Sequence, residues 1–235
     1  MTKEIIEMDI TKVLAEAGFK NDDDIHLMME GCGMDYSFEM DSRDYINFAK
    51  IDLKQGDKRG LVNSITNARR AIDCCSQKII KLFGLQARNN LPSKLVLLEQ
   101  IGVIAPSILQ RVNKDRNLAE HEFVLPNKKD VEEAIDIAEL FDCVVRGVLN
   151  NAATDFIISV SENDSSIGSL EFEFDEDDKK WTVKLHKENE VLMATIKNDE
   201  AVYKSILKIA ITLATDELKA IDSFKELLKI NENDG

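Results

Sequence analysis

An arginine, an asparagine and a histidine lie within six positions of each other in this 235-residue chain: Arg116, Asn117 and His121. They belong to the stretch 105–126, which has a proline near each end. Proline is tolerated in the first turn of a helix and disfavours helix at the residue before it, so we expect a helix of about 17 residues between the two prolines. The three side chains would then share one short helix.

These side-chain types suit the cleavage of RNA without a metal ion. In that reaction a ribose 2′-hydroxyl attacks the adjacent phosphate, and an imidazole can take or give the protons near neutral pH. A planar guanidinium can bind two phosphate oxygens as negative charge gathers on them. His121 would therefore exchange protons, Arg116 would hold the phosphate, and Asn117 would orient either one. We predict no cofactor and no metal site.

The string Arg-Asn-x-x-x-His resembles the signature of the HEPN domain family, in which a polar residue follows the arginine and a short spacer precedes the histidine. Here four residues separate Arg116 from His121, and Phe123 follows two places later. The strings at 52–73 and 91–106 are similar to the leading helices of HEPN-type proteins. The resemblance covers roughly residues 45–153. It implies a helical bundle, a nuclease site shared by two subunits, and a role in stress or phage defence beside an antitoxin or a nucleotidyltransferase.

Helix geometry favours a homodimer. Residues turn by about 100° each, so Asn117 and His121 lie roughly 40° apart on a helix, whereas Arg116 and His121 lie about 140° apart. Arg116 also continues an apolar row, where an uncompensated charge costs on the order of several kcal/mol to bury. If two motif helices meet across a two-fold axis, both copies of Arg116 and His121 gather in one cleft, and the Arg116 charge borders a groove and not an apolar core. The alternative is structural: Arg116 pairs with a neighbouring carboxylate, and His121 forms a hydrogen bond near the helix end.

Other basic side chains extend the expected RNA surface. The predicted RNA-binding residues are Lys114, Arg111, Arg69 and Arg70. For Arg69 and Arg70, which lie beside the apolar row of an earlier long helix, a solvated helix flank is an equal alternative. Carboxylates next to the motif favour a protonated histidine and lower the local affinity for phosphate.

The net charge of −14 opposes binding to nucleic acid as a whole, because phosphate contacts dominate that affinity. Its distribution is uneven. Residues 1–50 carry 5 basic and 12 acidic side chains, residues 51–154 carry 15 and 13, and residues 155–235 carry 10 and 19. The net charges are thus −7, +2 and −9, so a local basic groove is possible in the middle segment, flanked by acidic parts that would weaken or steer RNA binding.

Apolar spacing predicts a mostly α-helical protein. We expect an antiparallel four-helix, HEPN-like bundle over residues 46–153, since apolar side chains recur there at steps of 3 and 4. Ser93 is the expected N-cap of one short helix. Residues 1–45 are expected to form an acidic N-terminal extension with helices over 5–18 and 23–31. From 154 to 235 we expect a smaller, acidic α+β module.

This α+β module should contain a β-meander. Apolar residues alternate with polar ones near 156–160, 170–174 and 181–185, a fourth strand is expected around 191–196, and helices follow near 199–214 and 216–230. His26 and His186 have no metal-ligand spacing, and we interpret the first as a half-buried helix residue and the second as a surface residue near a strand end.

The remaining features describe a cytoplasmic protein. The four cysteines show no paired spacing, which indicates free thiols, and no segment is apolar enough to span a membrane. Two further readings stay open beside the endoribonuclease. One is a non-catalytic HEPN domain that binds a nucleotide or a protein partner, and the other is a purely structural helical dimer. Whether the chain is an enzyme is therefore undecided by its sequence.

Overall fold

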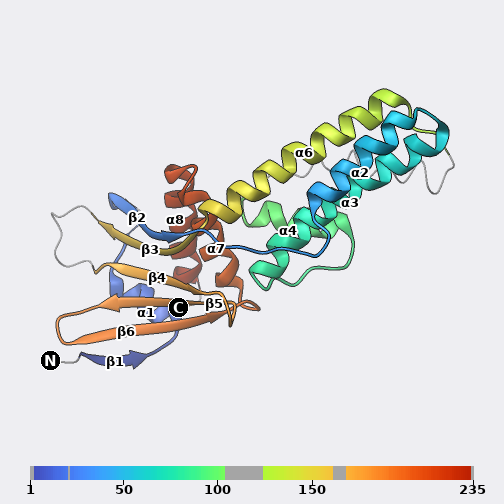
Figure 1. The fold of residues 1–235 in the computed structure, drawn as a ribbon. Coiled ribbons are helices and arrows are strands. Elements are labelled where there is room, and N and C mark those ends of the chain that lie inside the picture. The colour runs from blue at the N-terminus through green and yellow to red at the C-terminus, as the bar shows by residue number, and fades with distance from the viewer. Residues whose placement is uncertain (1–2, 21, 104–123, 161–167, 234–235) are drawn as a thin grey trace. The chain divides into compact units, whose positions relative to one another are not determined.

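The computed structural model describes residues 3–20, 22–103, 124–160 and 168–233. The chain divides into two compact units. The sheet unit comprises Met1–Met34, Phe83–Leu85 and Asn150–Gly235, and the helical unit comprises Asp35–Leu82 and Gln86–Leu149. Seven helices and six strands occur in the described ranges, and Figure 1 labels them. None of these helices is both long and apolar enough to cross a membrane.

One six-stranded mixed sheet forms the frame of the sheet unit, with the strand order β1-β6-β5-β4-β3-β2. The strands are β1 (Glu4–Glu7), β2 (Ile25–Cys32), β3 (Ala153–Val160), β4 (Leu170–Asp175), β5 (Lys180–His186) and β6 (Glu190–Lys197). β1 is parallel to β6, and all other neighbours are antiparallel. Since β2 and β3 are adjacent, the whole helical unit is inserted in the chain between two neighbouring strands.

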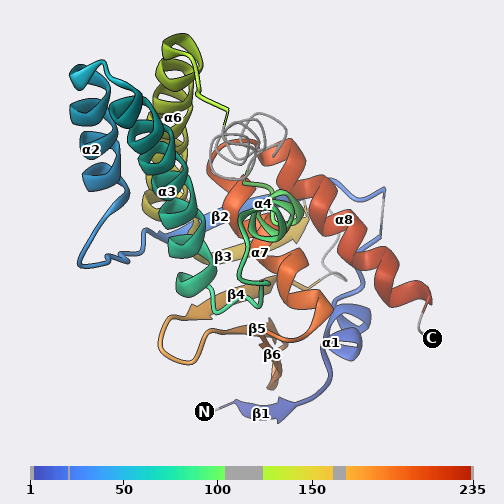
Figure 2. The same cartoon turned by 90° about the vertical axis from the view of Figure 1, so that its right-hand side faces the viewer.

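Three helices cover one face of this sheet (Figure 2): α1 (Ile10–Ala17), α7 (Ala201–Leu213) and α8 (Glu217–Asn233). Inward-facing rings fill the layer between helices and sheet. Phe156 stacks on Phe172 with ring centroids 4.6 Å apart, and Trp181 lies edge-on to Phe156 at 5.8 Å. Burying such large apolar side chains is the main stabilising contribution of the sheet unit.

The opposite face of the sheet is polar. Lys184 on β5 lies 2.5 Å from a carboxylate oxygen of Glu173 and 3.7 Å from one of Glu171 on β4. His186, at the end of β5, is exposed and lies 2.7 Å from the other oxygen of Glu171. One packed and one charged face is the usual arrangement of an antiparallel sheet.

The short segment Phe83–Leu85 joins the core of the sheet unit although helices of the helical unit flank it in sequence. The Phe83 ring lies 5.5 Å from Phe174, and its carbonyl accepts a 2.7 Å hydrogen bond from the Tyr203 hydroxyl. Gly84 has a φ of +62°, which favours glycine, and a Cβ there would lie 2.6 Å from the side-chain nitrogen of Asn198. The chain is thus anchored to the sheet unit midway through its helical stretch.

The described helices of the helical unit are α2 (Ser42–Gln55), α3 (Lys58–Leu82), α4 (Leu91–Gln100) and α6 (Lys128–Asn151), the last of which ends just inside the sheet unit. Asp41 caps α2 in a reciprocal capping box with Asp44. α2 and α3 pack closely, because Gly60 has no side chain: a Cβ there would lie 2.4 Å from the Asp52 carbonyl oxygen. The Ser64 hydroxyl also donates to the Ala49 carbonyl at 2.7 Å.

The prediction of a mostly helical protein, with a four-helix HEPN-like bundle followed by a smaller module, is wrong. The described residues form a six-stranded mixed sheet in addition to seven helices. The four predicted strands of the meander are present as β3 to β6, but β1 and β2 complete the sheet from the opposite end of the chain. The α+β part therefore surrounds the helical part in sequence.

The N-terminal segment is where the helical prediction fails. Only Ile10–Ala17 is helical within residues 5–18, and the predicted helix over 23–31 is strand β2. Leu27, Met28 and Met29 are consecutive apolar residues, so β2 lacks a clear alternation, and β1 has only four residues. Both strands depend on partners more than 100 residues away, an influence that local patterns cannot show. His26 consequently lies on a strand, where its side chain is exposed.

Candidate functional site

Most of the predicted site lies outside the described residues. Those positions are Arg116, Asn117, His121, Lys114 and Arg111. The motif helix, its composite site and the two-fold dimer therefore stay predictions. Two predicted RNA-binding residues are described: Arg69 is half-buried on α3, and Arg70 is exposed beside it. Of these two, Arg70 lines a pocket of the helical unit.

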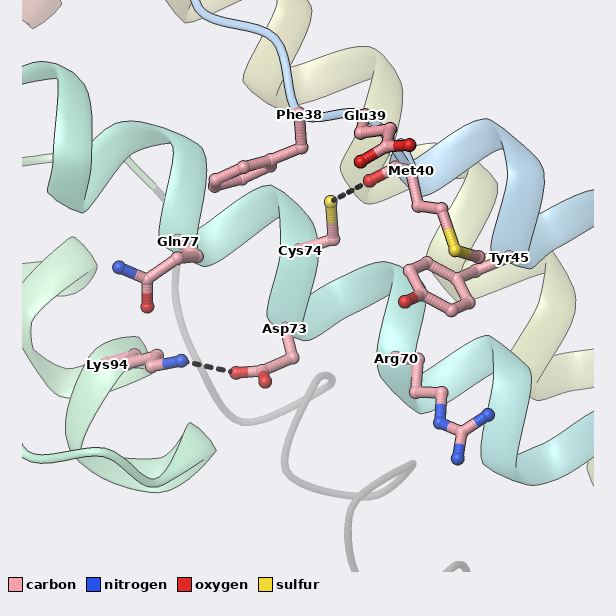
Figure 3. A pocket seen from close by; sticks show the side chains of 9 residues that line it. All are labelled: Phe38, Glu39, Met40, Tyr45, Arg70, Asp73, Cys74, Gln77 and Lys94. Carbon is pink, nitrogen blue, oxygen red and sulfur yellow. Dashed lines mark hydrogen bonds and ion pairs between the residues drawn. The ribbon is translucent and has the colours of Figure 1, made fainter.

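Arg70 lines an open pocket of about 590 Å³ in the helical unit (Figure 3). A volume of this size is within the range of ligand pockets. The lining residues come from α2, α3, α4 and the segment before α2: Phe38, Glu39, Met40, Tyr45, Arg70, Asp73, Cys74, Gln77 and Lys94. We refer to it as the α3 pocket.

The floor of the α3 pocket is one stripe of helix α3. Arg70, Asp73, Cys74 and Gln77 follow each other at steps of 3, 1 and 3, which places them on neighbouring turns of one face. The opposite face of α3 carries its buried apolar row. Because α3 is long and well packed on that side, the polar side chains on the pocket side are held on a rigid support.

Lys94 of α4 reaches the pocket from the other wall. Its ammonium lies 2.8 Å from a carboxylate oxygen of Asp73, and its side chain is only 5% exposed, compared with 35% for Asp73. An ammonium has three N–H donors. Asp73 takes one of them, and no second acceptor for Lys94 occurs among the described residues. A nearly buried cation thus retains donor capacity at the pocket.

Two aromatic side chains form the apolar part of the lining. Phe38 precedes α2, and its ring contacts that of Tyr36 at 5.3 Å in an edge-on arrangement. Tyr45 lies on the first turns of α2 and contacts Phe48 edge-on at 6.4 Å. In Figure 3 both rings flank the α3 stripe, with Met40 beside Tyr45. The α3 pocket thus combines aromatic faces with hydrogen-bonding groups.

Cys74 is a poor nucleophile in this position. Burial, reinforced by the nearby Asp41 carboxylate, raises the pKa of its thiol to about 11. Its sulfur lies 3.8 Å from the Met40 carbonyl oxygen. Since the thiolate is the reactive form, covalent catalysis by Cys74 is disfavoured at neutral pH.

A second, smaller pocket of about 260 Å³ surrounds a buried carboxylate, that of Asp142 on α6. Asp142 accepts a 2.6 Å hydrogen bond from the Ser42 hydroxyl, and it lies 2.8 Å from Arg146 and 3.7 Å from Arg43. These contacts pair its charge and bring α2 and α6 together. We interpret this cluster as a structural one.

A buried lysine beside this cluster is paired in the same way. Lys78, with a side chain 7% exposed, lies 2.5 Å from the Asp41 carboxylate. Burial opposes ionisation of Asp41, but hydrogen bonds from Lys78 and Ser42 outweigh it and lower the pKa of Asp41. The start of α2 is thereby fixed to α3.

One residue of the α3 pocket carries a signal in the sequence that our prediction did not include. Lys94 is a lone cation in the apolar run Leu91–Leu98, a place where lysine is rarely buried without a partner. Its partner Asp73 could not be assigned, because it lies 21 residues earlier on another helix. Tyr45 and Gln77 carry no local signal.

Within the described ranges, no group of three or more His, Cys, Asp or Glu side chains is arranged to hold a metal ion. Comparisons with models of protein families, with curated proteins and with solved structures find no match for this chain. Its function must therefore be inferred from its own residues.

Proposed function

We propose that this chain is a metal-independent endoribonuclease of the HEPN kind that acts as a homodimer. The observation that carries the proposal is the string Arg116-Asn117-Leu118-Ala119-Glu120-His121, which lies in sequence between α4 and α6. It contains a proton-transfer group and a phosphate-binding group at the spacing of the family signature. Half of the Lys and Arg residues of the chain, 15 of 30, also lie in residues 51–154, the segment that contains this string.

The proposed reaction needs only these side chains. The ribose 2′-oxygen attacks the adjacent phosphorus while His121 of one subunit removes its proton, and the bond to the 5′-oxygen of the next nucleotide breaks. His121 of the other subunit donates a proton to this leaving 5′-oxygen, which becomes a hydroxyl. Arg116 binds the phosphate oxygens in the transition state, and Asn117 orients the histidine. The products are a 2′,3′-cyclic phosphate and a 5′-hydroxyl end.

The α3 pocket supports RNA as the substrate. Arg70 and Lys94 supply positive charge, and Tyr45 and Phe38 supply aromatic faces, which is the combination that binds unpaired nucleotides. All four cysteines are free, which fits a reducing compartment such as the cytoplasm. The family resemblance further suggests regulation by an antitoxin or a nucleotidyltransferase.

The test is cleavage of total RNA by the purified chain in the presence of EDTA, beside Arg116→Ala and His121→Ala. We expect the wild type alone to cleave and to leave cyclic-phosphate ends. His121→Gln is a useful third variant, because it retains polarity at that position but cannot transfer protons. Equal activity in all four proteins, or loss of activity in EDTA, would refute the proposal.

A second candidate function is nucleotide binding without cleavage. The α3 pocket favours it, because its volume and its mixed lining suit a ligand of nucleotide size whether or not the motif is active. Overexpression separates the two functions. An active ribonuclease should be toxic to cells and His121→Ala should relieve the toxicity, whereas a nucleotide-binding protein should be tolerated in both forms.

A further inference from the structure

We propose that the α3 pocket is a subsite for one unpaired nucleotide of the RNA, with its base beside Tyr45 and Phe38 and its phosphate at Arg70 and Lys94. This inference rests on the proposed function for the identity of the ligand as RNA. It assigns a binding role to side chains outside the Arg-Asn-x-x-x-His string. All of them belong to the helical unit.

The cations of the pocket favour a ligand that carries oxygen acceptors. The Lys94 side chain is only 5% exposed, lines the pocket and donates to Asp73, and an ammonium that donates once to this carboxylate has two further N–H donors. Arg70 is exposed, and one of its guanidinium nitrogens lies 3.3 Å from the Asn67 side-chain oxygen, so the rest of the guanidinium is open to a phosphate. A phosphodiester supplies acceptors to both cations.

The aromatic side chains favour a ligand with a flat ring. Phe38 and Tyr45 come from the segment before α2 and from α2 itself, and they line the same pocket. Stacking of a base on such a ring contributes roughly 1–3 kcal/mol and tolerates any base. A nucleotide satisfies the aromatic and the cationic requirement at once, whereas a bare anion satisfies only the second.

Two polar groups at the floor suggest a preference among bases. Asp73 has one oxygen engaged by Lys94 and a second one that can accept from a base. Ionised carboxylates only accept hydrogen bonds, so Asp73 favours bases with an exocyclic amino group over uracil, whose only base donor in RNA, N3–H, lies between two carbonyl oxygens that a carboxylate repels. Gln77, at the neighbouring turn of α3, can donate and accept. We therefore expect adenine to be bound more tightly than uracil.

The experiment measures binding to fluorescein-labelled 2′-O-methyl oligoadenylate and oligouridylate. Methylation blocks the 2′-oxygen nucleophile, so binding is observed without cleavage. The variants are Tyr45→Ala, Gln77→Ala and Arg70→Ala. Arg59→Ala is the matched control, because Arg59 is an exposed arginine of the same helix that does not line the pocket.

The expected result is tighter binding of oligoadenylate by the wild type, and a loss of about fivefold or more in Tyr45→Ala. Arg70→Ala should also reduce the slope of log affinity against log salt by about 0.7, the value for one phosphate contact to a single strand. Arg59→Ala should retain wild-type affinity. Gln77→Ala, which removes no hydrogen bond within the described residues, should weaken binding without unfolding the helix.

Cleavage of unmodified RNA by the same proteins separates this inference from the proposed function. If the wild type cleaves RNA while the three pocket variants bind and cleave as Arg59→Ala does, the subsite is refuted and the ribonuclease stands. If the wild type binds through the pocket but never cleaves, the ribonuclease is refuted and the subsite stands as a binding site. Absence of binding to both oligonucleotides by the wild type would overturn the subsite.

Discussion

The Ser42 hydroxyl lies 2.6 Å from a carboxylate oxygen of Asp142, although 100 residues separate the two in sequence. Asp142 is almost fully buried, and Arg146 pairs with its other oxygen at 2.8 Å. Hydrogen bonds to a buried charged group contribute about 1.5–3 kcal/mol, and removing the Asp142 carboxylate leaves Arg146 and Arg43 solvated because their side chains are 39% and 59% exposed. We expect Asp142→Ala to lower the free energy of unfolding by that amount, and Ser42→Ala by about 1–2 kcal/mol, in urea titrations.

Glu132→Ala is the control for this prediction. Glu132 also lies on α6 and pairs with Lys128 at 3.6 Å, but both side chains are at least half exposed. An exposed pair of this kind contributes at most about 1 kcal/mol. Similar losses in Asp142→Ala and Glu132→Ala would show that the buried cluster does not stabilise the fold as we describe.

Acid should weaken the attachment of α2 to α3. The pKa of Asp41 in the folded chain is lowered, so its charge stabilises the fold at pH values above the ordinary aspartate pKa of about 3.9. That stabilisation is lost as the pH falls through the lowered folded value. Thermal unfolding of the wild type and Asp41→Asn should therefore differ at pH 7 and converge below about pH 4.

The exposed residue Asp136 provides the comparison for this pH dependence. Asp136→Asn should follow the wild-type pH profile throughout. A difference between the wild type and Asp41→Asn that is the same at pH 3 and pH 7 would mean that ionisation of Asp41 contributes nothing.

The four thiols should react with iodoacetamide in a fixed order. Cys32 and Cys143 are exposed, whereas Cys74 is half-buried and Cys75 is buried. Burial is the main cause that raises the pKa of Cys74 to about 11 and that of Cys75 to about 12. At pH 8 we expect rapid alkylation of the first pair, slow alkylation of Cys74, and alkylation of Cys75 only in urea, as measured by peptide mass spectrometry. Rapid alkylation of Cys75 in the folded chain would contradict the packing of α3.

The parts of the fold that depend on local periodicity could be predicted, and those that depend on distant partners could not. The predicted strand over 181–185 is β5, because Trp181 and its alternate neighbours face a packed layer. β1 and β2 were not predicted, since their strand character comes from pairing with β6 and β3. Ser93 was also not the cap of α4: the Asn90 side chain caps that helix and accepts a hydrogen bond from the Ser93 N–H.

In the candidate site, too, residues with a local sequence signal could be predicted and residues that depend on distant partners could not. Arg70 was identified from its charge beside an apolar row, and it lines the α3 pocket. Lys94 and Asp73 were missed, because their significance comes from a contact between two helices. The motif residues Arg116 and His121 lie outside the described residues, so for them the sequence prediction stands alone.

Tyr203→Phe should destabilise the sheet unit. The Tyr203 hydroxyl is buried and donates a 2.7 Å hydrogen bond to the Phe83 carbonyl, 120 residues earlier. The substitution removes the donor and leaves a buried carbonyl without this partner, at a cost of about 1–3 kcal/mol. Trp181 is the only tryptophan of the chain and is fully buried in the sheet unit, so its fluorescence during urea unfolding reports on that unit.

The matched control is Tyr36→Phe in the helical unit, because no described residue accepts a hydrogen bond from the Tyr36 hydroxyl. We expect Tyr203→Phe to unfold at a lower urea concentration than the wild type by Trp181 fluorescence, and Tyr36→Phe to unfold at the wild-type midpoint. Because Phe83 lies between α3 and α4 in sequence, a lower midpoint for Tyr203→Phe would also mean that a contact to this connection stabilises the sheet unit. Equal midpoints in the two variants would mean that the bond to Phe83 does not contribute to stability.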